Sequence, residues 1–476
     1  MNYHDGRITE ADALVEARRV FDRQHRLSRR EPPPPLELRR DRLARLRALV
    51  SGHAEELAQA VGDDFGVRAR TETELMEIAP SLAAIDLAAR KLPRWMAPER
   101  RRVSANLQPA RAWVRWEPLG VVGVISPWNY PLQLAISPMV DALAAGNRVM
   151  LKPSELTPRF AELLARLVAE RFDEGEAAVV TGGVEVGQAF AELPFDHLLF
   201  TGSTAVGRKV YQAAAANLTP VTLELGGKSP AIVCADYPLA KAARSIAWGK
   251  WVNAGQTCIA PDYVLVPAAR ADALAEELLA QARRSYPTIA GNPDYSSVIS
   301  ERHRRRLQQG VDEARRAGAR IMRHEDEGAE AEGKIGPTVV LHAPAEGVLM
   351  REEIFGPVLP IVPYRTLDEA IAFVAARDRP LALYCFTNSE TDQERVLGRT
   401  LSGGVTLNGT LLHVADESLP FGGVGPSGIG AYHGREGFRR FSHARGVHKV
   451  GFVNALELLG PPWGKAAAAV GKMLVK

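Results

Sequence analysis

Cysteine is scarce in this chain of 476 residues, which contains only Cys234, Cys258 and Cys385. An odd number of widely spaced thiols argues against a disulfide framework and favours a reducing compartment, so we expect a cytoplasmic protein. No CxxC pair and no cluster of histidine and cysteine has the spacing of metal ligands. We therefore expect no metal site.

The chain also has no large excess of charge of one sign, since 59 Lys and Arg residues nearly balance 56 Asp and Glu residues. This balance gives no indication of nucleic-acid binding. We interpret the local basic run RHRRR at 302–306 as the solvated face of a helix. The polar amino-terminal residues MNYHDGRITE lack the apolar core of a signal peptide, which agrees with the expected cytoplasmic location.

Long hydrophobic runs are the third absence. The most apolar stretch, residues 120–140, is interrupted by prolines and is too short between them to cross a bilayer as one helix. The carboxyl-terminal residues GKAAAAVGKMLVK are apolar and basic, which leaves two interpretations: a helix on a membrane surface, or a terminal helix that frays or packs on a partner. We favour the second and do not expect membrane association.

Short apolar runs separated by helical segments indicate the fold. These runs predict strands at 120–126, 148–152, 177–180, 197–200 and 221–225. Helical stretches, for example 157–172 and 207–218, separate most of them. Strands without polar alternation, spaced by helices, are typical of a parallel sheet covered on both faces, the doubly wound α/β fold. Ligands of such a fold bind at the carboxyl ends of the strands.

The same alternation resumes after residue 230. The runs AIVC (231–234) and DYVLVP (262–267) and further apolar runs near the end of the chain predict strands, and helical stretches lie between them. We therefore predict a second doubly wound α/β domain. The sequence contains no repeat of fixed period.

Two segments at predicted strand ends carry residues suited to a dinucleotide. FTGSTAVG, with Gly202, Ser203 and Gly207, connects a predicted strand to a predicted helix. The free backbone N–H groups at the start of such a helix favour a pyrophosphate, and the alternative is an ordinary capped helix without a ligand. VMLKPSE places Lys152 and Glu155 where both can bond ribose hydroxyls, with a surface ion pair as the alternative. The segment GVGPSG matches GxGxxG, but it follows no strand and contains a proline, so we interpret it as a structural loop.

Three further segments carry residues that can act on a carbonyl group. ISPWNYP holds Asn129 in a stiff loop after the first strand, where its amide can donate to an oxyanion or only satisfy loop carbonyls. VTLELGGKSP places Glu224 within an apolar strand, so its carboxyl is either paired or has a raised pKa suited to a base. WVNAGQTCIA places Cys258 in a loop after a helix, whereas Cys234 and Cys385 lie in apolar strands and are expected to be buried and inert.

No single segment settles the function, but the order of the segments is specific. PWNYP, KPSE, FTGST, LELGGK, GQTC, EIFGP and PFGG follow one another over most of the chain, and in this order they resemble the aldehyde dehydrogenase superfamily. The spacing between Glu224 and Cys258 also resembles that of the family's base and nucleophile. The resemblance implies a Rossmann-like cofactor domain, a catalytic domain and a small β element for oligomerisation.

The resemblance also implies a role for each catalytic residue. Cys258 would attack the aldehyde carbon, and Asn129 with the backbone N–H of Cys258 would hold the oxyanion of the thiohemiacetal. Glu224 would activate the water that hydrolyses the resulting thioester to a carboxylic acid.

The implied cofactor-binding residues are Trp128, Lys152, Glu155, Gly202, Ser203, Gly207, Leu225, Glu353 and Phe355. By the same resemblance, Lys152 and Glu155 would meet the adenosine ribose and Ser203 the pyrophosphate. Glu353 would hold the nicotinamide ribose, with Phe355 beside it. Because Glu155 repels a 2′-phosphate, we expect NAD as the first cofactor, while Lys152 leaves NADP as a second one.

The run PFGGVGPSGIGAYHGREGFRRFSHARGV resembles the class 3 and coniferyl aldehyde dehydrogenase branch. This implies aromatic or medium-to-long-chain aldehydes, coniferaldehyde among them, and a homodimer. The implied domains are an NAD(P)-binding domain (1–100 and 119–226), a catalytic domain (227–424) and an oligomerisation element (101–118 and 440–460). The residues alone leave two other functions open: a cysteine thioester or ester hydrolase without a nucleotide, and a non-catalytic binding protein on the same scaffold.

Overall fold

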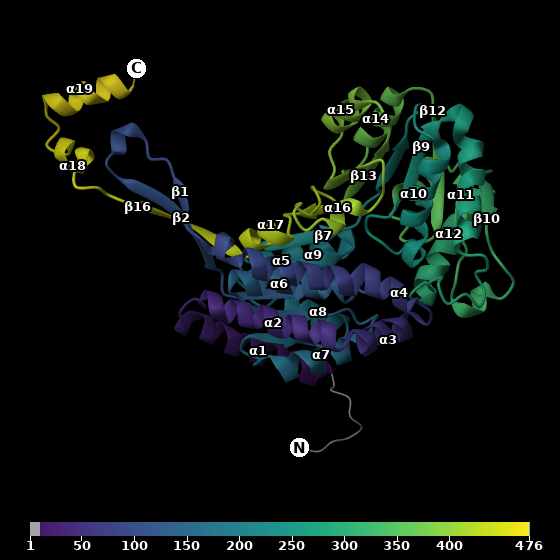
Figure 1. The fold of residues 1–476 in the computed structure, drawn as a ribbon, viewed down its shortest axis with the longest axis horizontal. Helices are drawn as coiled ribbons and strands as arrows, with labels where there is room; N and C mark the ends of the chain where they lie inside the picture. Colours follow the sequence, from purple (N-terminus) through teal and green to yellow (C-terminus); the bar gives the residue numbers. More distant parts are fainter. Residues whose placement is uncertain (1–9, 476) are drawn as a thin grey trace, which may run out of the picture.

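The computed structural model describes residues 10–475 and arranges them in two α/β domains and a projecting arm (Figure 1). The described strands form three sheets, one in each of these parts. The expectation that the amino terminus is no signal peptide rests on residues 1–10, of which residues 1–9 lie outside the described part of the chain.

The first sheet contains five parallel strands and one short antiparallel strand, in the order β15-β7-β6-β3-β4-β5. The strands are β3 (Val121–Ile125), β4 (Arg148–Lys152), β5 (Ala177–Val179), β6 (His197–Gly202), β7 (Val221–Leu225) and β15 (Gly428–Ile429). The chain runs from β3 through β4 to β5 and then returns to β6 on the other side of β3. Doubly wound sheets bind ligands at such a reversal, beyond the carboxyl ends of the strands.

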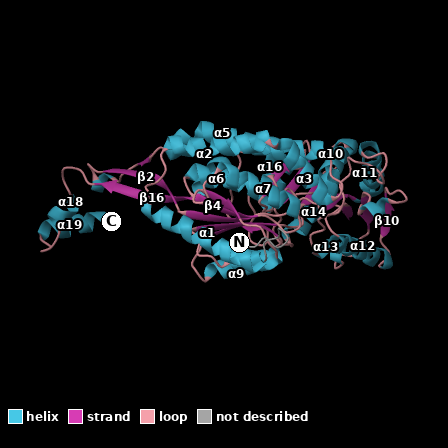
Figure 2. Cartoon of the chain, turned by 90° about the horizontal axis from the view of Figure 1, so that it is seen from below, coloured by secondary structure: helices cyan, strands magenta, loops and turns pink. Residues whose placement is uncertain are grey.

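Helices cover both faces of the first sheet, as the continuous apolar strands predicted. Figure 2 shows α2, α5 and α6 on one face and α1 and α9 on the other. The helices are α1 (Glu10–Arg30), α2 (Leu36–Gly52), α3 (Ala54–Phe65), α4 (Arg70–Thr73), a π-helical turn (Glu74–Ile78), α5 (Ala79–Met96), α6 (Gln133–Ala145), α7 (Pro158–Arg171), α8 (Val184–Ala191) and α9 (Thr204–Ala215). Leu43, Leu46 and Leu49 of α2 are fully buried on one face. Val20 and Phe21 of α1 are buried on the other.

The second sheet is also mainly parallel, in the order β10-β11-β12-β9-β8-β13-β14 with only β10 antiparallel to its neighbour. The strands are β8 (Pro230–Val233), β9 (Tyr263–Pro267), β10 (Arg320–Arg323), β11 (Thr338–Leu341), β12 (Val358–Tyr364), β13 (Ala382–Phe386) and β14 (Gly404–Leu407). The helices are α10 (Leu239–Trp251), α11 (Ala271–Ser285), α12 (Glu301–Arg316), α13 (Val348–Arg351), α14 (Leu367–Ala375), α15 (Glu390–Arg399) and α16 (Leu412–Ala415). Cys234 and Cys385 are free cysteines at β8 and β13 and are buried, as their apolar segments predicted.

The arm is a three-stranded antiparallel sheet of β1 (Glu99–Arg101), β2 (Arg111–Pro118) and β16 (Ser442–Lys449). The helix α17 (Gly434–Arg440) leads into it, and α18 (Ala455–Leu459) and α19 (Lys465–Leu474) follow it. Figure 1 places α18 and α19 at the outer end of the arm. The terminal residues thus form a helix, and nearby Leu458 and Trp463 are exposed. Across residues 10–475, no helix has the length and apolar character needed to span a bilayer.

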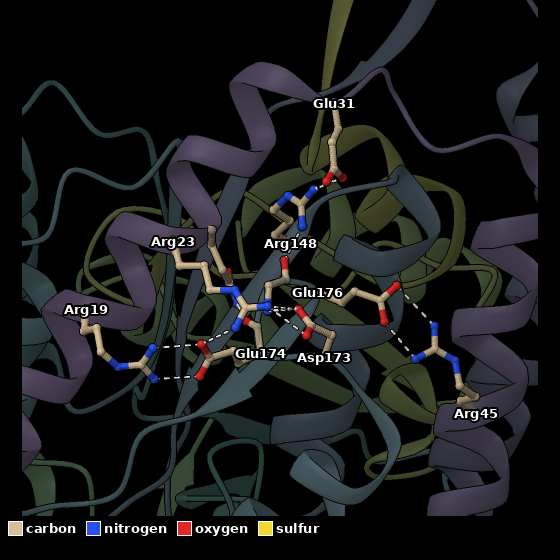
Figure 3. A network of polar contacts seen from close by, with 10 residues as sticks. Arg19, Arg23, Glu31, Arg45, Arg148, Asp173, Glu174 and Glu176 are labelled. Carbon is tan, nitrogen blue, oxygen red and sulfur yellow. Dashed lines mark hydrogen bonds and ion pairs between the residues drawn. The ribbon is translucent and has the colours of Figure 1, made fainter.

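A network of ion pairs connects α1 and α2 to the residues that precede β5 (Figure 3). From α1, Arg19 lies 2.6 Å from Glu174 and Arg23 lies 2.8 Å from Asp173. From α2, Arg45 lies 2.8 Å from Glu176. Exposed pairs of this kind contribute only about 0–1 kcal/mol each, so the buried apolar faces hold these helices in place.

The two valines of α1 provide a direct test of that conclusion. Val20 is 3% exposed and Val15 is 70% exposed on the same helix. We expect Val20→Ala to lower the free energy of unfolding by about 2 kcal/mol, because two buried methyl groups are lost and a cavity remains. Val15→Ala should change it by less than about 0.5 kcal/mol. Chemical denaturation of both variants measures the difference, and equal losses would contradict the assigned orientation of α1.

Candidate active site

Cys258 lies in a loop whose backbone conformation is unusual. After α10 the chain passes through Asn253 (φ 50°), Ala254 (φ 49°) and Gly255 (φ 73°), three consecutive residues in the left-handed region. A side chain at Gly255 would collide with the backbone of Gly356. This tight reversal leads to Cys258, whose side chain is partly buried and lines a pocket.

The side chain of Gln256 holds this loop in place. Its amide Nε2 donates to the carbonyl oxygens of Asn253 and Ser297, both at 3.0 Å. Its Oε1 accepts from the backbone N–H of Ile299 at 2.9 Å. Gln256 is fully buried, so these bonds are shielded from water and fix the position of the neighbouring thiol.

Asn129 reaches the same place from the first domain. It follows the carboxyl end of β3, is 3% exposed, and its Nδ2 donates to the carbonyl oxygen of Gln256 at 3.1 Å. A side-chain amide has two N–H donors, and this is the single bond recorded for Nδ2 within residues 10–475. Asn129 and Cys258 line one pocket, so the second N–H is available to an oxygen bound there.

Glu224 occupies the same pocket from the end of β7. It is 3% exposed, and within the described part of the chain neither carboxyl oxygen has a hydrogen-bond partner. Burial raises the pKa of this carboxyl well above its usual value. Of the two states that the strand pattern allowed, the structure therefore favours the unpaired carboxyl with a raised pKa.

The pocket has a volume of about 420 Å³ and also includes Trp128, Leu225, Glu353 and Phe355. Burial, followed by the charge of nearby Asp262, raises the pKa of Glu353 to about 8. Phe355 has φ 49° and meets the Trp128 ring edge-on at 5.3 Å between centroids. Trp128 and Leu225 thus line the pocket from the strand ends of the first sheet, and Glu353 and Phe355 line it from the segment before β12.

A second pocket of about 520 Å³ continues the first along the sheet edge. Lys152, Glu155, Gly202 and Ser203 line it, and the two pockets share Trp128, Gly202 and Ser203. The Lys152 Nζ lies 3.7 Å from the Glu155 carboxylate, and burial lowers the pKa of Lys152. The two pockets together form one cleft across the reversal between β3 and β6.

The end of the cleft nearest α9 suits a phosphate group. Ser203 caps α9 by accepting a hydrogen bond from the backbone N–H of Val206, and the positive end of the helix dipole opens into the cleft. Gly207 lets α9 lie against β7, because a side chain there would meet Leu225 at 2.5 Å. The buried hydroxyl of Thr201 in the same cleft has no partner within residues 10–475. Unpaired polar groups and an open helix terminus fit a dinucleotide.

The interpretation of 302–306 as a solvated helix face is wrong for two of its residues. His303 lines both pockets and lies 5.2 Å from the Trp128 ring. Arg306 lines the first pocket and donates to the carbonyl oxygen of Glu353 at 3.0 Å. The two lie three residues apart on one face of α12, but a basic run alone does not reveal which face meets a pocket.

Comparison with known proteins agrees with this geometry. The family described as "Aldehyde dehydrogenase family" matches residues 10–447, and the chain belongs to this family. A Pseudomonas aeruginosa protein named "Probable coniferyl aldehyde dehydrogenase" is 50% identical over 447 residues, which cover 94% of each chain. The rat "Aldehyde dehydrogenase, dimeric NADP-preferring" is 41% identical over 91% of this chain and 93% of its own. The solved substrate-bound state of Staphylococcus aureus AldH is 37% identical, with a TM-score of 0.90 over 96% of this chain and 99% of that one.

The protein is therefore an enzyme that oxidises an aldehyde to a carboxylic acid with NAD or NADP. Its sequence is similar to coniferyl aldehyde dehydrogenases and to the class 3 enzymes. Within residues 10–475 no group of three or more His, Cys, Asp or Glu side chains is arranged to hold a metal ion.

The environment of Cys258 predicts how its reactivity depends on pH. Burial, then the charges of Glu353 and Glu224, raise the pKa of the thiol to about 12 in the protein without nucleotide. Only the thiolate reacts with iodoacetamide, so the alkylation rate at Cys258 should rise about tenfold per pH unit from 7 to 10. Peptide mass spectrometry follows the labelling, with buried Cys385 as the unreactive control. A plateau near pH 8 would contradict this assignment.

Proposed function

We propose that Cys258, Asn129 and Glu224 form the catalytic centre and that the aldehyde carbon binds between them. The observation that supports this most directly is that all three side chains line one pocket, although they come from different segments of the chain. The Cys258 sulfur attacks the carbonyl carbon and forms a thiohemiacetal. The Asn129 Nδ2 and the backbone N–H of Cys258 donate to its oxyanion.

Glu224 acts in the second half of the reaction. A nicotinamide bound in the cleft would supply the hydride acceptor, and the oxidised substrate would stay on Cys258 as a thioester. Glu224 then takes a proton from the water that attacks this thioester, and the acid leaves. Its raised pKa makes it a stronger base once ionised, and its lack of hydrogen-bond partners leaves both oxygens available to water.

The cleft provides a place for each part of the cofactor. Lys152 and Glu155 bind the hydroxyls of the adenosine ribose, and Ser203 with the start of α9 binds the pyrophosphate. Glu353 binds the nicotinamide ribose, and Phe355 packs beside it. Gly202 lines the cleft beside the proposed cofactor, Gly207 lets α9 pack against Leu225, and Trp128 and Leu225 line the pocket.

The proposed substrates are aromatic and medium-to-long-chain aldehydes of the coniferaldehyde type. The name of the Pseudomonas aeruginosa relative supports this class. The name of the rat relative supports a dimer, for which the arm of β1, β2 and β16 offers a surface. We place the five parallel strands of the first sheet in an NAD(P)-binding domain (1–100 and 119–226), the second sheet in a catalytic domain (227–424), and the oligomerisation element at 101–118 and 440–460. Three free cysteines support a cytoplasmic location.

Replacement of Glu224 separates the two halves of the reaction. In Glu224→Gln the thioester should still form, so mixing with coniferaldehyde and NAD should give a burst of up to one NADH per subunit. Steady-state turnover should fall by about 10²-fold or more, because the general base is gone. Stopped-flow absorbance at 340 nm measures both phases.

Two control variants accompany this measurement. Cys258→Ala should give neither burst nor turnover, whereas Cys234→Ala should behave as the wild type, because Cys234 is buried at the end of β8. A normal steady state in Glu224→Gln, or a burst in Cys258→Ala, would overturn the proposed roles. Release of acid from an ester or thioester, with no oxidation of coniferaldehyde in the presence of NAD or NADP, would instead support a cysteine hydrolase.

Replacement of Glu155 tests the preference between the two cofactors. The Glu155 carboxylate is half exposed at the pocket edge, where it repels a 2′-phosphate. Glu155→Gln should shift the ratio of kcat/KM for NADP over NAD by about tenfold toward NADP, equivalent to about 1.4 kcal/mol. Glu185→Gln on α8 is the matched control and should leave the ratio unchanged. An unchanged ratio in Glu155→Gln would show that another group selects the cofactor.

A further inference from the structure

The carbonyl oxygen of Asn129 accepts two hydrogen bonds. One comes from the Arg68 Nη1 at 2.9 Å and the other from the Asn253 Nδ2 at 3.0 Å. A carbonyl oxygen has two lone pairs, so this acceptor is saturated. The two bonds fix the orientation of the peptide from which the Asn129 side chain projects.

Arg68 is itself held on all sides. Its side chain has no solvent exposure, and its Nη2 forms an ion pair with Glu77 at 2.9 Å. The guanidinium lies between the rings of Phe65 (4.8 Å) and Tyr130 (5.0 Å). The planar group therefore has little freedom to change the direction of its bond to Asn129.

Glu77 connects this arginine to the segment after Asn129. Its side chain is fully buried, and Oε2 accepts from the backbone N–H groups of Leu132 (2.8 Å) and Gln133 (3.2 Å). Glu77 lies in the π-helical turn Glu74–Ile78, which joins α4 to α5. Arg68 and Glu77 thus hold residues 129–133 at both ends: the carbonyl of Asn129 and the start of α6.

We propose that Arg68, supported by Glu77, is a positioning residue that orients Asn129 for the oxyanion of the reaction. The proposal rests on the oxyanion role assigned to Asn129 above. Arg68 is not among the residues that line the pocket, and its hydrogen bond goes to the carbonyl oxygen of Asn129. Because a small misplacement of an oxyanion donor lowers the reaction rate steeply, the geometry of this buried bond sets how well the donor is used.

The Cys258 loop is held by other contacts. Gln256 bonds to Ser297 and Ile299, and the hydroxyl of Tyr384 donates to the carbonyl oxygen of Ile259. A change at Arg68 should therefore alter the stabilisation of the oxyanion more than the reactivity of the thiol. This difference gives a measurement that a general loss of structure would not reproduce.

The test compares Arg68→Lys with Arg39→Lys. Arg39 is similarly buried and donates to the carbonyl oxygens of Ala144 and Ala145, at the far end of α6 from Asn129. We expect Arg68→Lys to slow the NADH burst with coniferaldehyde by about tenfold. The single amine of lysine cannot replace the two guanidinium nitrogens that contact Asn129 and Glu77. Arg39→Lys should stay within twofold, and iodoacetamide should label Cys258 at the wild-type rate in both variants, since alkylation develops no oxyanion.

A double-mutant cycle separates this proposal from the proposed function. Asn129→Ala should slow the burst by about 10²- to 10³-fold, and adding Arg68→Lys to it should cost less than a further twofold. A normal burst in Asn129→Ala would overturn the oxyanion assignment together with this proposal. A slow Asn129→Ala combined with a normal Arg68→Lys, or with a full tenfold loss in the double variant, would overturn the role of Arg68 alone.

A second variant covers the case in which Arg68→Lys does not fold. The Glu72 side chain is also largely buried and lies 4.0 Å from Arg68. Arg68→Met combined with Glu72→Gln and Glu77→Gln therefore removes all three buried charges and keeps an acceptor for the N–H groups of Leu132 and Gln133. This triple variant should show the same tenfold slower burst with unchanged alkylation of Cys258. A burst within twofold of the wild type would overturn the proposal.

Discussion

The hydrogen bond from the Asn129 amide to the carbonyl oxygen of Gln256 joins the two halves of the active site. It connects residues that are 127 positions apart, one after the first strand of the first domain and the other in the loop that carries Cys258. Each segment is also held by contacts within its own domain, Asn129 by Arg68 and the Cys258 loop by the Gln256 side chain. The bond between them links the amide to the loop of the sulfur, and the proposed chemistry depends on their relative position.

The carboxyl groups around this bond are held in a state that suits the same chemistry. Burial raises the pKa of Glu224 and of Glu353, and burial also raises the pKa of the Cys258 thiol. In the protein without ligands, the pocket therefore favours neutral groups over charged ones.

The sequence predicted the framework of the molecule because the strands are buried on both faces. Runs such as 148–152 and 221–225 contain no polar alternation, and the structure shows them as strands with helices on either side. The unusual environment of Glu224 was also predictable, since a carboxyl in the middle of such a run must be paired or neutral. The order of the motifs then indicated the family, to which the comparison assigns the chain.

Other features depend on contacts between distant segments and were not predictable in this way. The basic run on α12 gave no sign that His303 and Arg306 meet the cleft while Arg302 and Arg305 stay exposed. Nothing near Arg68 in the sequence indicates that it contacts Asn129, because the partner lies 61 residues away. A charged residue on a helix or in a loop carries no local pattern that reveals which element will cover it.

The central claim is that substrate becomes bonded to the sulfur of Cys258. Mass spectrometry after acid quenching of the wild-type enzyme, mixed briefly with NAD and coniferaldehyde, tests it most directly. Trypsin should release residues 251–270 as one peptide in which Cys258 is the only cysteine. The mass of this peptide should increase by that of the acyl group bound to Cys258 as a thioester. An acyl group on any other peptide, or on none during turnover, would contradict it.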